Sequence, residues 1–300
     1  GGGGAAAGPY TIDAMAEHAI SPADVVQGNV GNCYFLSAVA TAVADPEVRR
    51  QLIDASFEAA GIYGVPFFLR GRWRMVWVDA YFPCYQVAAA TAAAATPEGG
   101  GTWRPVFART GGKHHEAWLM VVEKAFAKLH GCYEALAGGQ VASALSYLTG
   151  GVAGTELLPR SLHSAEQEWA KLCSMVAEGF AGAGTPSEGD RFDGLVPGHA
   201  YALLAACEAD GTRLVMLRNP WGESEWRGEF CAGCASWQRR PLLARAAADA
   251  AKLHGDASPQ LHGATDESDD SSGGSRSGSG GGGGSGSGGG GGGGGRRRRR

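Results

Sequence analysis

The sequence contains no run of about 18 apolar residues, so it offers no candidate for a membrane-spanning helix. It also lacks an excess of basic charge: 26 Lys and Arg against 30 Asp and Glu give a formal net charge of −4, which argues against nucleic acid as a partner. The opening residues, GGGGAAAGPY, include neither a methionine nor the charged-then-apolar pattern of a signal peptide, and we interpret the chain as a piece of a longer protein. The seven cysteines are odd in number and scattered, which is not the pattern of a disulfide framework and indicates an intracellular, reducing compartment.

Two segments lack the mixture of residues that a packed core needs. The stretch 255–300 is rich in Gly and Ser and ends in a run of arginines, so it cannot bury apolar surface and we expect a disordered tail. The Ala-rich segment VAAATAAAAT at 87–96 carries no polar chemistry and is expected to decorate a loop. The folded body is therefore predicted to run from residue 9 to residue 240.

Within this body, helical and strand patterns alternate. The segment NCYFLSAVATAVA at 32–44 is apolar nearly all round and predicts a buried helix with Cys33 in its first turn. The apolar spacing of 115–131 predicts a second helix that ends at Gly131. Two strand patterns flank Arg70-Gly71-Arg72, and two more, within 199–221, flank Asp210-Gly211, so each pair predicts a hairpin.

Cys33 is the strongest candidate for a nucleophile. A helix N-terminus supplies partial positive charge and free N–H groups, both of which stabilise a thiolate. The alternative is a buried cysteine that serves only as a small apolar side chain. The setting favours the nucleophile, because Gln27 lies six residues earlier and the glycines between them let a substrate backbone approach. The Gln27 amide and the Cys33 N–H would together form a two-donor oxyanion hole, as acyl transfer requires.

A cysteine nucleophile needs a base, and His199 is the histidine with an accompanying pattern. It opens an apolar strand directly after Gly198, and the strand that follows ends at Asn219, so the hairpin should bring Asn219 back to His199. The Asn219 carbonyl would then fix the imidazole tautomer, and Trp221 would screen the pair from water. Without Cys33, Asn219 would equally well mark an ordinary turn.

Four stretches in chain order, together with VWVDAYFPC, resemble the protease core of the calpain family: QGNVGNCYFLSA, EKAFAKLHGCYEALAGG, LVPGHAYAL and RNPWGESEW. The similarity covers residues 20 to 230. It implies an α+β, papain-like cysteine protease core of two subdomains with the cleft between them, a mainly helical lobe over 9–140 and a β-rich lobe over 141–240. It further implies a calcium-dependent intracellular cysteine endopeptidase that performs limited proteolysis of protein or peptide substrates, with further domains or a regulatory subunit outside this piece.

The resemblance also assigns roles to individual residues. The catalytic triad and its supports correspond to Cys33, His199, Asn219, the oxyanion donor Gln27 and the neighbouring indole Trp221. The glycines that meet substrate main chain correspond to Gly139 and Gly198.

Calcium enters through the same resemblance, and it takes oxygen ligands, mostly carboxylates. Asp24 and Glu116 match ligands in the first subdomain, and Glu225 matches one ligand in the second. Ala232 stands where the family pattern has an acidic ligand, which weakens the second site.

The sequence departs from the family pattern in several places. Asn32 stands where many members have Asp and Tyr34 where many have Trp, without an expected loss of chemistry. After Phe230 the resemblance stops and the continuation predicts a helix, so we expect the second lobe to lack closing strands. The alternative function is therefore a catalytically impaired calpain-like scaffold or regulatory binding module, and acyl transfer to an amine uses the same triad. Cys231 and Cys234 lack a second pair of ligands for zinc.

Overall fold

The computed structural model describes residues 20–87, 102–111, 116–158, 164–188, 193–222 and 226–252. The predicted tail at 255–300, nearly all of the Ala-rich segment and Glu225 lie outside these residues. All described residues belong to one unit, 1–263. Helices and antiparallel sheets both occur, which confirms the α+β class, while the boundary between two lobes at residue 140 stays a prediction.

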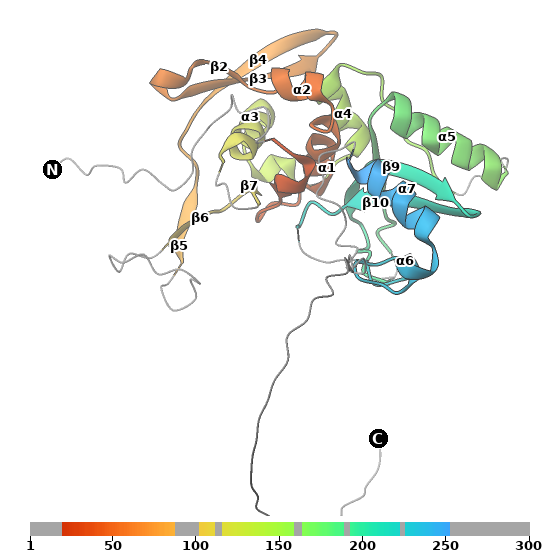
Figure 1. Ribbon diagram of the computed structural model, residues 1–300. Coiled ribbons are helices and arrows are strands. Elements are labelled where there is room, and N and C mark those ends of the chain that lie inside the picture. Colours follow the sequence, from red (N-terminus) through yellow and green to blue (C-terminus); the bar gives the residue numbers. More distant parts are fainter. Residues whose placement is uncertain are drawn as a thin grey trace, which may run out of the picture. The chain divides into compact units, whose positions relative to one another are not determined.

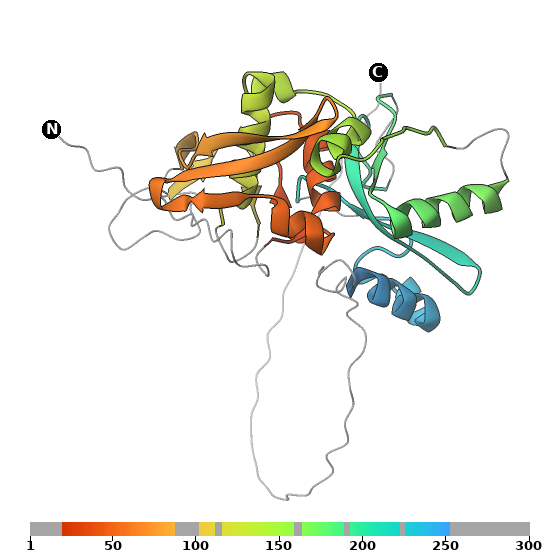
Figure 2. The ribbon, with the colours of Figure 1, turned by 90° about the horizontal axis from the view of Figure 1, so that it is seen from above.

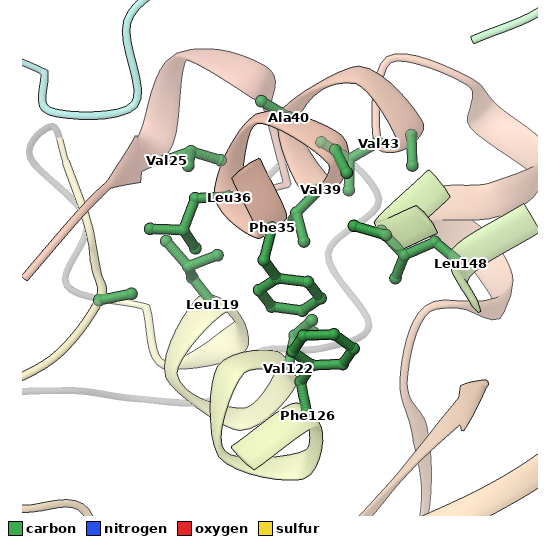
Figure 3. Close-up of a cluster of buried hydrophobic side chains, with 14 of the residues drawn as sticks. Val25, Phe35, Leu36, Val39, Ala40, Val43, Leu119, Val122, Phe126 and Leu148 are labelled. Atoms are coloured by element: carbon green, nitrogen blue, oxygen red, sulfur yellow. The ribbon is translucent and has the colours of Figure 1, made fainter. Parts of the chain in front are cut away.

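The helix α1 (Cys33–Ala42) lies at the centre of the hydrophobic core, and every residue after Cys33 in it is buried. The helix α3 (Trp118–His130) packs against it through Phe35 and Phe126, whose stacked rings have centroids 3.9 Å apart (Figure 3). The helix α4 (Val141–Thr149) contacts α1 as well and contributes Leu148 to the same cluster. The helices predicted over 32–44 and 115–131 are confirmed as α1 and α3, and α3 ends as expected at Gly131.

A sheet of order β2-β3-β4 covers α3 and α4. The strands β3 (Ile62–Leu69) and β4 (Arg72–Asp79) pair antiparallel and are joined by Arg70 and Gly71, with φ of 50° and 78°. Two positive φ values in a two-residue loop define the turn whose twist matches a hairpin, so the first predicted hairpin is confirmed. The other elements within residues 22–136 are short: η1 (Pro22–Asp24), β1 (Val25–Val26), α2 (Pro46–Gln51), β2 (Asp54–Phe57), η2 (Glu58–Ala60), β5 (Cys84–Val87), β6 (Thr102–Pro105), β7 (Arg109–Thr110) and η3 (Glu134–Leu136).

A second antiparallel sheet has the order β10-β9-β8. Its strands are β8 (Ala181–Gly184), β9 (Ala200–Ala209) and β10 (Thr212–Arg218). Asp210 and Gly211, with φ of 52° and 68°, connect β9 to β10 and confirm the second predicted hairpin. In both views, α1 lies between this sheet and the β2-β3-β4 sheet (Figures 1 and 2). Because α1 contacts β8 and β9, the helix that begins with Cys33 packs on the strand that begins just after His199.

Helices also cover the second sheet. Both α5 (Ala165–Glu178) and α7 (Pro241–Lys252) contact β9 (Figure 1). The short helix α6 (Ser236–Arg239) precedes α7. The helix expected after Phe230 is found as two helices, α6 and α7, which Arg240 separates, and 231–235 forms turns, so the prediction is wrong for 231–235 and at Arg240. Within the described ranges, no helix combines the length and apolar character needed to cross a membrane.

Candidate active site

Cys33 is the first residue of α1 and is half-buried. Its N-cap, Asn32, makes no side-chain capping bond to the helix. The first N–H groups of a helix have no intrahelical partner, so the N–H groups of Cys33 and Tyr34 face whatever lies at this end. Uncapped donors together with the positive end of the helix dipole suit a thiolate or an oxyanion.

Glu123 of α3 is hydrogen-bonded to Asn32, the N-cap residue of α1. It is 1 % exposed, and Oε1 accepts a hydrogen bond from Asn32 Nδ2 at 2.7 Å while Oε2 accepts from the Ala108 N–H at 2.8 Å. Burial raises the pKa of this carboxyl to about 7, and the two hydrogen bonds act in the opposite direction. Sequence reasoning missed Glu123; the available signal was a lone acidic residue within the otherwise apolar buried face of the predicted helix.

Gln27 lies in the loop that leads from β1 to α1. Its side-chain Nε2 donates to Val30 O at 2.7 Å, and a primary amide has a second N–H to offer. Its backbone N–H donates to Pro220 O at 2.7 Å. The Arg218 guanidinium, at the end of β10, donates to the carbonyls of Ala23 and Val25. These bonds make the segment before Cys33 a direct neighbour of the segment that carries Asn219.

His199 and Asn219 form the predicted pair. Asn219 Oδ1 lies 2.8 Å from His199 Nε2, and the same oxygen accepts a hydrogen bond from the backbone N–H of Trp221 at 3.0 Å. Because a carbonyl oxygen only accepts, Nε2 of the neutral imidazole carries the proton and Nδ1 is left as the acceptor. Burial lowers the pKa of His199, which is 4 % exposed, and the bond to Asn219 partly offsets that shift. A neutral imidazole with a free acceptor nitrogen is the form that takes a proton from a thiol.

Aromatic rings and a threonine fix the position of His199. The Trp221 and Tyr201 rings lie with centroids 4.4 and 4.9 Å from the imidazole. Tyr201 Oη accepts from the buried Val196 N–H at 2.8 Å, which holds that ring in place. Thr185 bonds both sides of the His199 backbone, since its N–H donates to His199 O and its Oγ1 accepts from His199 N, each at 3.0 Å. Thr185 and Tyr201 carry no motif, and sequence reasoning did not identify them.

The two predicted substrate-binding glycines lie beside these groups. Gly198 directly precedes His199 in the left-handed region, with φ of 61°, and its N–H donates to Pro186 O at 2.7 Å. A Cβ at Gly139 would come within 2.5 Å of the Tyr34 ring, so this glycine lies directly against the first turn of α1. Both backbones are therefore close to the candidate catalytic groups.

Asp24 and Glu116, the predicted calcium ligands, flank the β1–β7 pair. Asp24 O accepts a hydrogen bond from the Gly111 N–H at 2.7 Å, and Glu116 O accepts one from Thr110 Oγ1 at 2.6 Å. The donors are the last residue of β7 and the residue after it, so the backbones of Asp24 and Glu116 are both bound at the end of β7. Both side chains are half-buried carboxylates, the donor type that calcium prefers, and their assignment as calcium ligands stays a prediction. No group of three or more His, Cys, Asp or Glu residues suited to a metal occurs in the described part of the chain. Glu225 lies outside that part.

A separate pocket lies between β4 and α3, and Trp77, Lys124 and Tyr133 are among its lining residues. None of the predicted catalytic residues line it. Of its two lysines, Lys124 already binds the Asp79 carboxylate and the Tyr81 carbonyl, and Lys128 binds the Trp77 carbonyl. We therefore locate the candidate active site where acid–base and nucleophilic groups converge, around α1 and the start of β9.

Known proteins match most of the length of this chain. A model of the calpain family cysteine protease domain matches residues 11–255. The calpain-type cysteine protease DEK1 of Arabidopsis thaliana is 41% identical over 230 residues, which are 73% of this chain and 10% of that protein. ADL1 of Oryza sativa subsp. japonica, also a calpain-type cysteine protease, is 40% identical over 231 residues, with 74% and 10% covered. The human calpain-2 catalytic subunit is 32% identical over 230 residues, with 71% and 30% covered.

These alignments add two facts. The chain spans about a tenth of the length of the plant relatives and three tenths of calpain-2. The family match also continues through α6 and α7 to residue 255, so the expectation that the resemblance stops after Phe230 is wrong. The helical residues after Phe230 do not carry chemistry-bearing motifs, which is why motif reading did not extend to them.

Proposed function

Since the chain belongs to the calpain family of cysteine proteases, a family of hydrolases, we propose that it is an endopeptidase in which Cys33 attacks a peptide carbonyl of a protein substrate. The observation that carries the proposal is the 2.8 Å contact between His199 Nε2 and Asn219 Oδ1, which leaves Nδ1 free to act as the base. The packing of α1 against β9 supports it, because Cys33 begins one element and His199 precedes the other.

The proposed mechanism assigns one task to each group. His199 Nδ1 takes the proton from Cys33 Sγ, and the thiolate attacks the substrate carbonyl carbon. The Cys33 N–H and the second N–H of the Gln27 amide bind the oxyanion, while Val30 O holds that amide in place. His199 then gives its proton to the leaving amine, and water, deprotonated by His199, releases the acyl group.

Substrate recognition in this proposal rests on main chain. Gly139 is exposed and lies next to the first turn of α1, and Gly198 lies next to His199. Contacts to backbone rather than to side chains predict broad specificity and limited proteolysis at accessible segments. We place the enzyme in an intracellular, reducing compartment on the strength of its odd number of scattered cysteines.

Calcium dependence is the finer part of the proposal, with Asp24 and Glu116 as ligands. Bound calcium would supply positive charge that these two carboxylates share. Arg218 already holds the carbonyls on either side of Asp24, so ordering of Asp24 is coupled to the end of β10, next to Asn219. Calorimetric titration should show calcium affinity reduced at least about tenfold by Asp24→Asn and by Glu116→Gln, and unchanged by Glu178→Gln at the exposed end of α5. Equal affinities in all four proteins would remove these two residues from the site.

The catalytic assignment is tested with a thiol-directed inhibitor in the presence of calcium, followed by peptide mapping. The adduct should lie on Cys33, and casein cleavage should be lost in Cys33→Ala and retained in Cys132→Ala, whose cysteine is exposed and distant from the triad in sequence. Labelling elsewhere with Cys33 unmodified would contradict the proposal. If the wild type and Cys33→Ala are equally inactive and both folded, the binding-module alternative holds instead.

A further inference from the structure

Two cysteines outside the proposed active site lie in a single turn between β10 and α6. The Cys234 N–H donates to Cys231 O at 3.1 Å, which closes a four-residue turn with Gly233 at a φ of 70°. Trp237 Nε1 donates to the same Cys231 carbonyl at 2.9 Å and holds the turn against α6. Both cysteines are free and half-buried, and they are the first and last residues of this turn, whose end Cα atoms lie within about 7 Å of each other, close to the separation that a disulfide spans.

The environment makes the two sulfur atoms unequal. The Ser236 hydroxyl and N–H, the Phe230 backbone and the Cys231 thiol all stabilise a Cys234 thiolate, and they lower its pKa to about 7. Desolvation and the neighbouring Cys234 raise the pKa of Cys231. The Glu229 carboxylate, 3.2 Å from Ser236 Oγ, competes for the single hydroxyl proton. One sulfur atom is thus suited to attack, and its neighbour to resolve the product.

We propose that Cys231 and Cys234 form a reversible intramolecular disulfide, a redox modification site that reacts with low-molecular-weight disulfides such as glutathione disulfide. The Cys234 thiolate attacks one sulfur of the oxidant, forms a mixed disulfide and expels one thiolate, which takes a proton from water. Cys231 then loses its proton to water and attacks the Cys234 sulfur, expelling the second thiolate. Two protein thiols lose two electrons in total, and the small disulfide gains them.

The location gives the disulfide a structural consequence. Its turn follows Arg227, whose N–H donates to Asp193 O at 2.7 Å, and it leads into α7, which covers β9. The bond would therefore fix the connection between the strand that ends near Asn219 and the helix that covers β9. This inference does not depend on the proposed catalysis, since neither cysteine belongs to the triad.

The test uses the full chain, equilibrated at pH 7 in glutathione buffers of graded redox potential. Free thiols are blocked with iodoacetamide, and trypsin cuts after Arg227 and Arg239, which leaves both cysteines on the single peptide GEFCAGCASWQR. In oxidising buffers this peptide should become unalkylated and lighter by two hydrogens, while the peptides with exposed Cys84 and Cys132 stay alkylated. In reducing buffers it should carry two alkyl groups.

Single serine variants separate attack from resolution. Cys231→Ser should accumulate a glutathione adduct on Cys234, because no resolving thiol remains. Cys234→Ser should form its adduct on Cys231 roughly fivefold to tenfold more slowly, as expected when the more acidic thiol is removed. The proposal is overturned if, in the wild type, the two cysteines are modified independently, or if either one pairs with a different cysteine.

Discussion

Replacement of Glu123 by Gln should abolish a pH dependence of stability that the wild-type chain has between about pH 5 and pH 8. Glu123 is buried beneath the first turn of α1, and its oxygens accept from Asn32 and from the Ala108 N–H. No lysine or arginine is among the causes of its pKa shift, so burial of the charged form dominates. The carboxylate therefore destabilises the fold when it ionises.

The magnitude follows from the shift in pKa. Burial raises the pKa of Glu123 from 4.5 to about 7, and each unit corresponds to about 1.4 kcal/mol, so the effect is about 3 kcal/mol. Between these two pKa values the folded state binds more protons than the unfolded state, and stability falls as pH rises. The contribution is fully present below about pH 4.5 and is lost as the pH passes through about 7.

Glutamine fits the same site without charge. Its carbonyl oxygen can accept from the Ala108 N–H, and its NH₂ can donate to Asn32 Oδ1 once the Asn32 amide rotates by half a turn. Among the described residues, Asn32 Oδ1 is a buried atom with no hydrogen-bond partner; the rotation pairs this oxygen and puts the Asn32 NH₂ in its former place, so the variant has no more unpaired groups at this contact than the wild type. We expect Glu123→Gln to match the wild type near pH 5 and to exceed it in stability near pH 8.

Urea unfolding in steps of pH measures the effect, in a Cys33→Ala background that prevents self-cleavage. The free energy of unfolding should fall by about 3 kcal/mol in the parent over this range and stay nearly level in Glu123→Gln. Glu178→Gln, at the exposed end of α5, is the matched control and should retain the slope of the parent. Parallel slopes in the parent and Glu123→Gln would refute the reasoning.

Substitutions at three further positions test the core and a helix cap. Phe35→Ala removes the ring stacked on Phe126 and should lower the free energy of unfolding in urea by about 3–5 kcal/mol. Gly28→Ala places a Cβ 2.2 Å from the Phe107 carbonyl carbon. Because this neighbour is backbone, it cannot move aside as easily as a side chain, and the thermal midpoint of unfolding should fall clearly below that of the parent. Asp45→Ala removes the acceptor for two N–H groups of α2 and should cost about 1 kcal/mol in the same urea assay, whereas Asp45→Ser should recover most of it.

Local patterns in the sequence predicted much of the fold. The pairs Arg70-Gly71 and Asp210-Gly211 placed both hairpins, because few residue pairs adopt two positive φ values. The end of α3 was predicted from Gly131, whose φ is 105°. The turn at 231–235 was missed because its apolar and small residues fit a helix equally well, and the structure turns there through hydrogen bonds rather than through a motif.

Some residues of the candidate site could also be predicted from the sequence, and others could not. His199 and Asn219 could be brought together from the sequence because the hairpin returns the end of β10 to the start of β9, although the register, in which Arg218 pairs with Ala202, does not place the two residues directly opposite each other. Thr185 and Glu123 could not, since each contacts the site from a distant segment and acts on another residue's backbone or side chain. Nucleophiles and bases have distinctive residue types, whereas their supports are ordinary residues that become meaningful only when the fold brings them together.

Position 32 shows how such a support constrains the sequence. Many members of the family have Asp at this position. An Asp carboxyl 2.7 Å from Glu123 would have to share a proton with it, since two buried carboxylates at that distance cannot both ionise. The Asn32 amide donates instead, so in this chain Glu123 titrates as a single group and the charge beneath α1 is at most −1. A carboxylate pair that shares one proton also carries −1, so Asn32 adds no negative charge near the first turn and does not oppose the thiolate that the proposed mechanism places on Cys33. The departure from the pattern at position 32 is therefore compatible with the nucleophile, and its effect is carried by a glutamate 91 residues away.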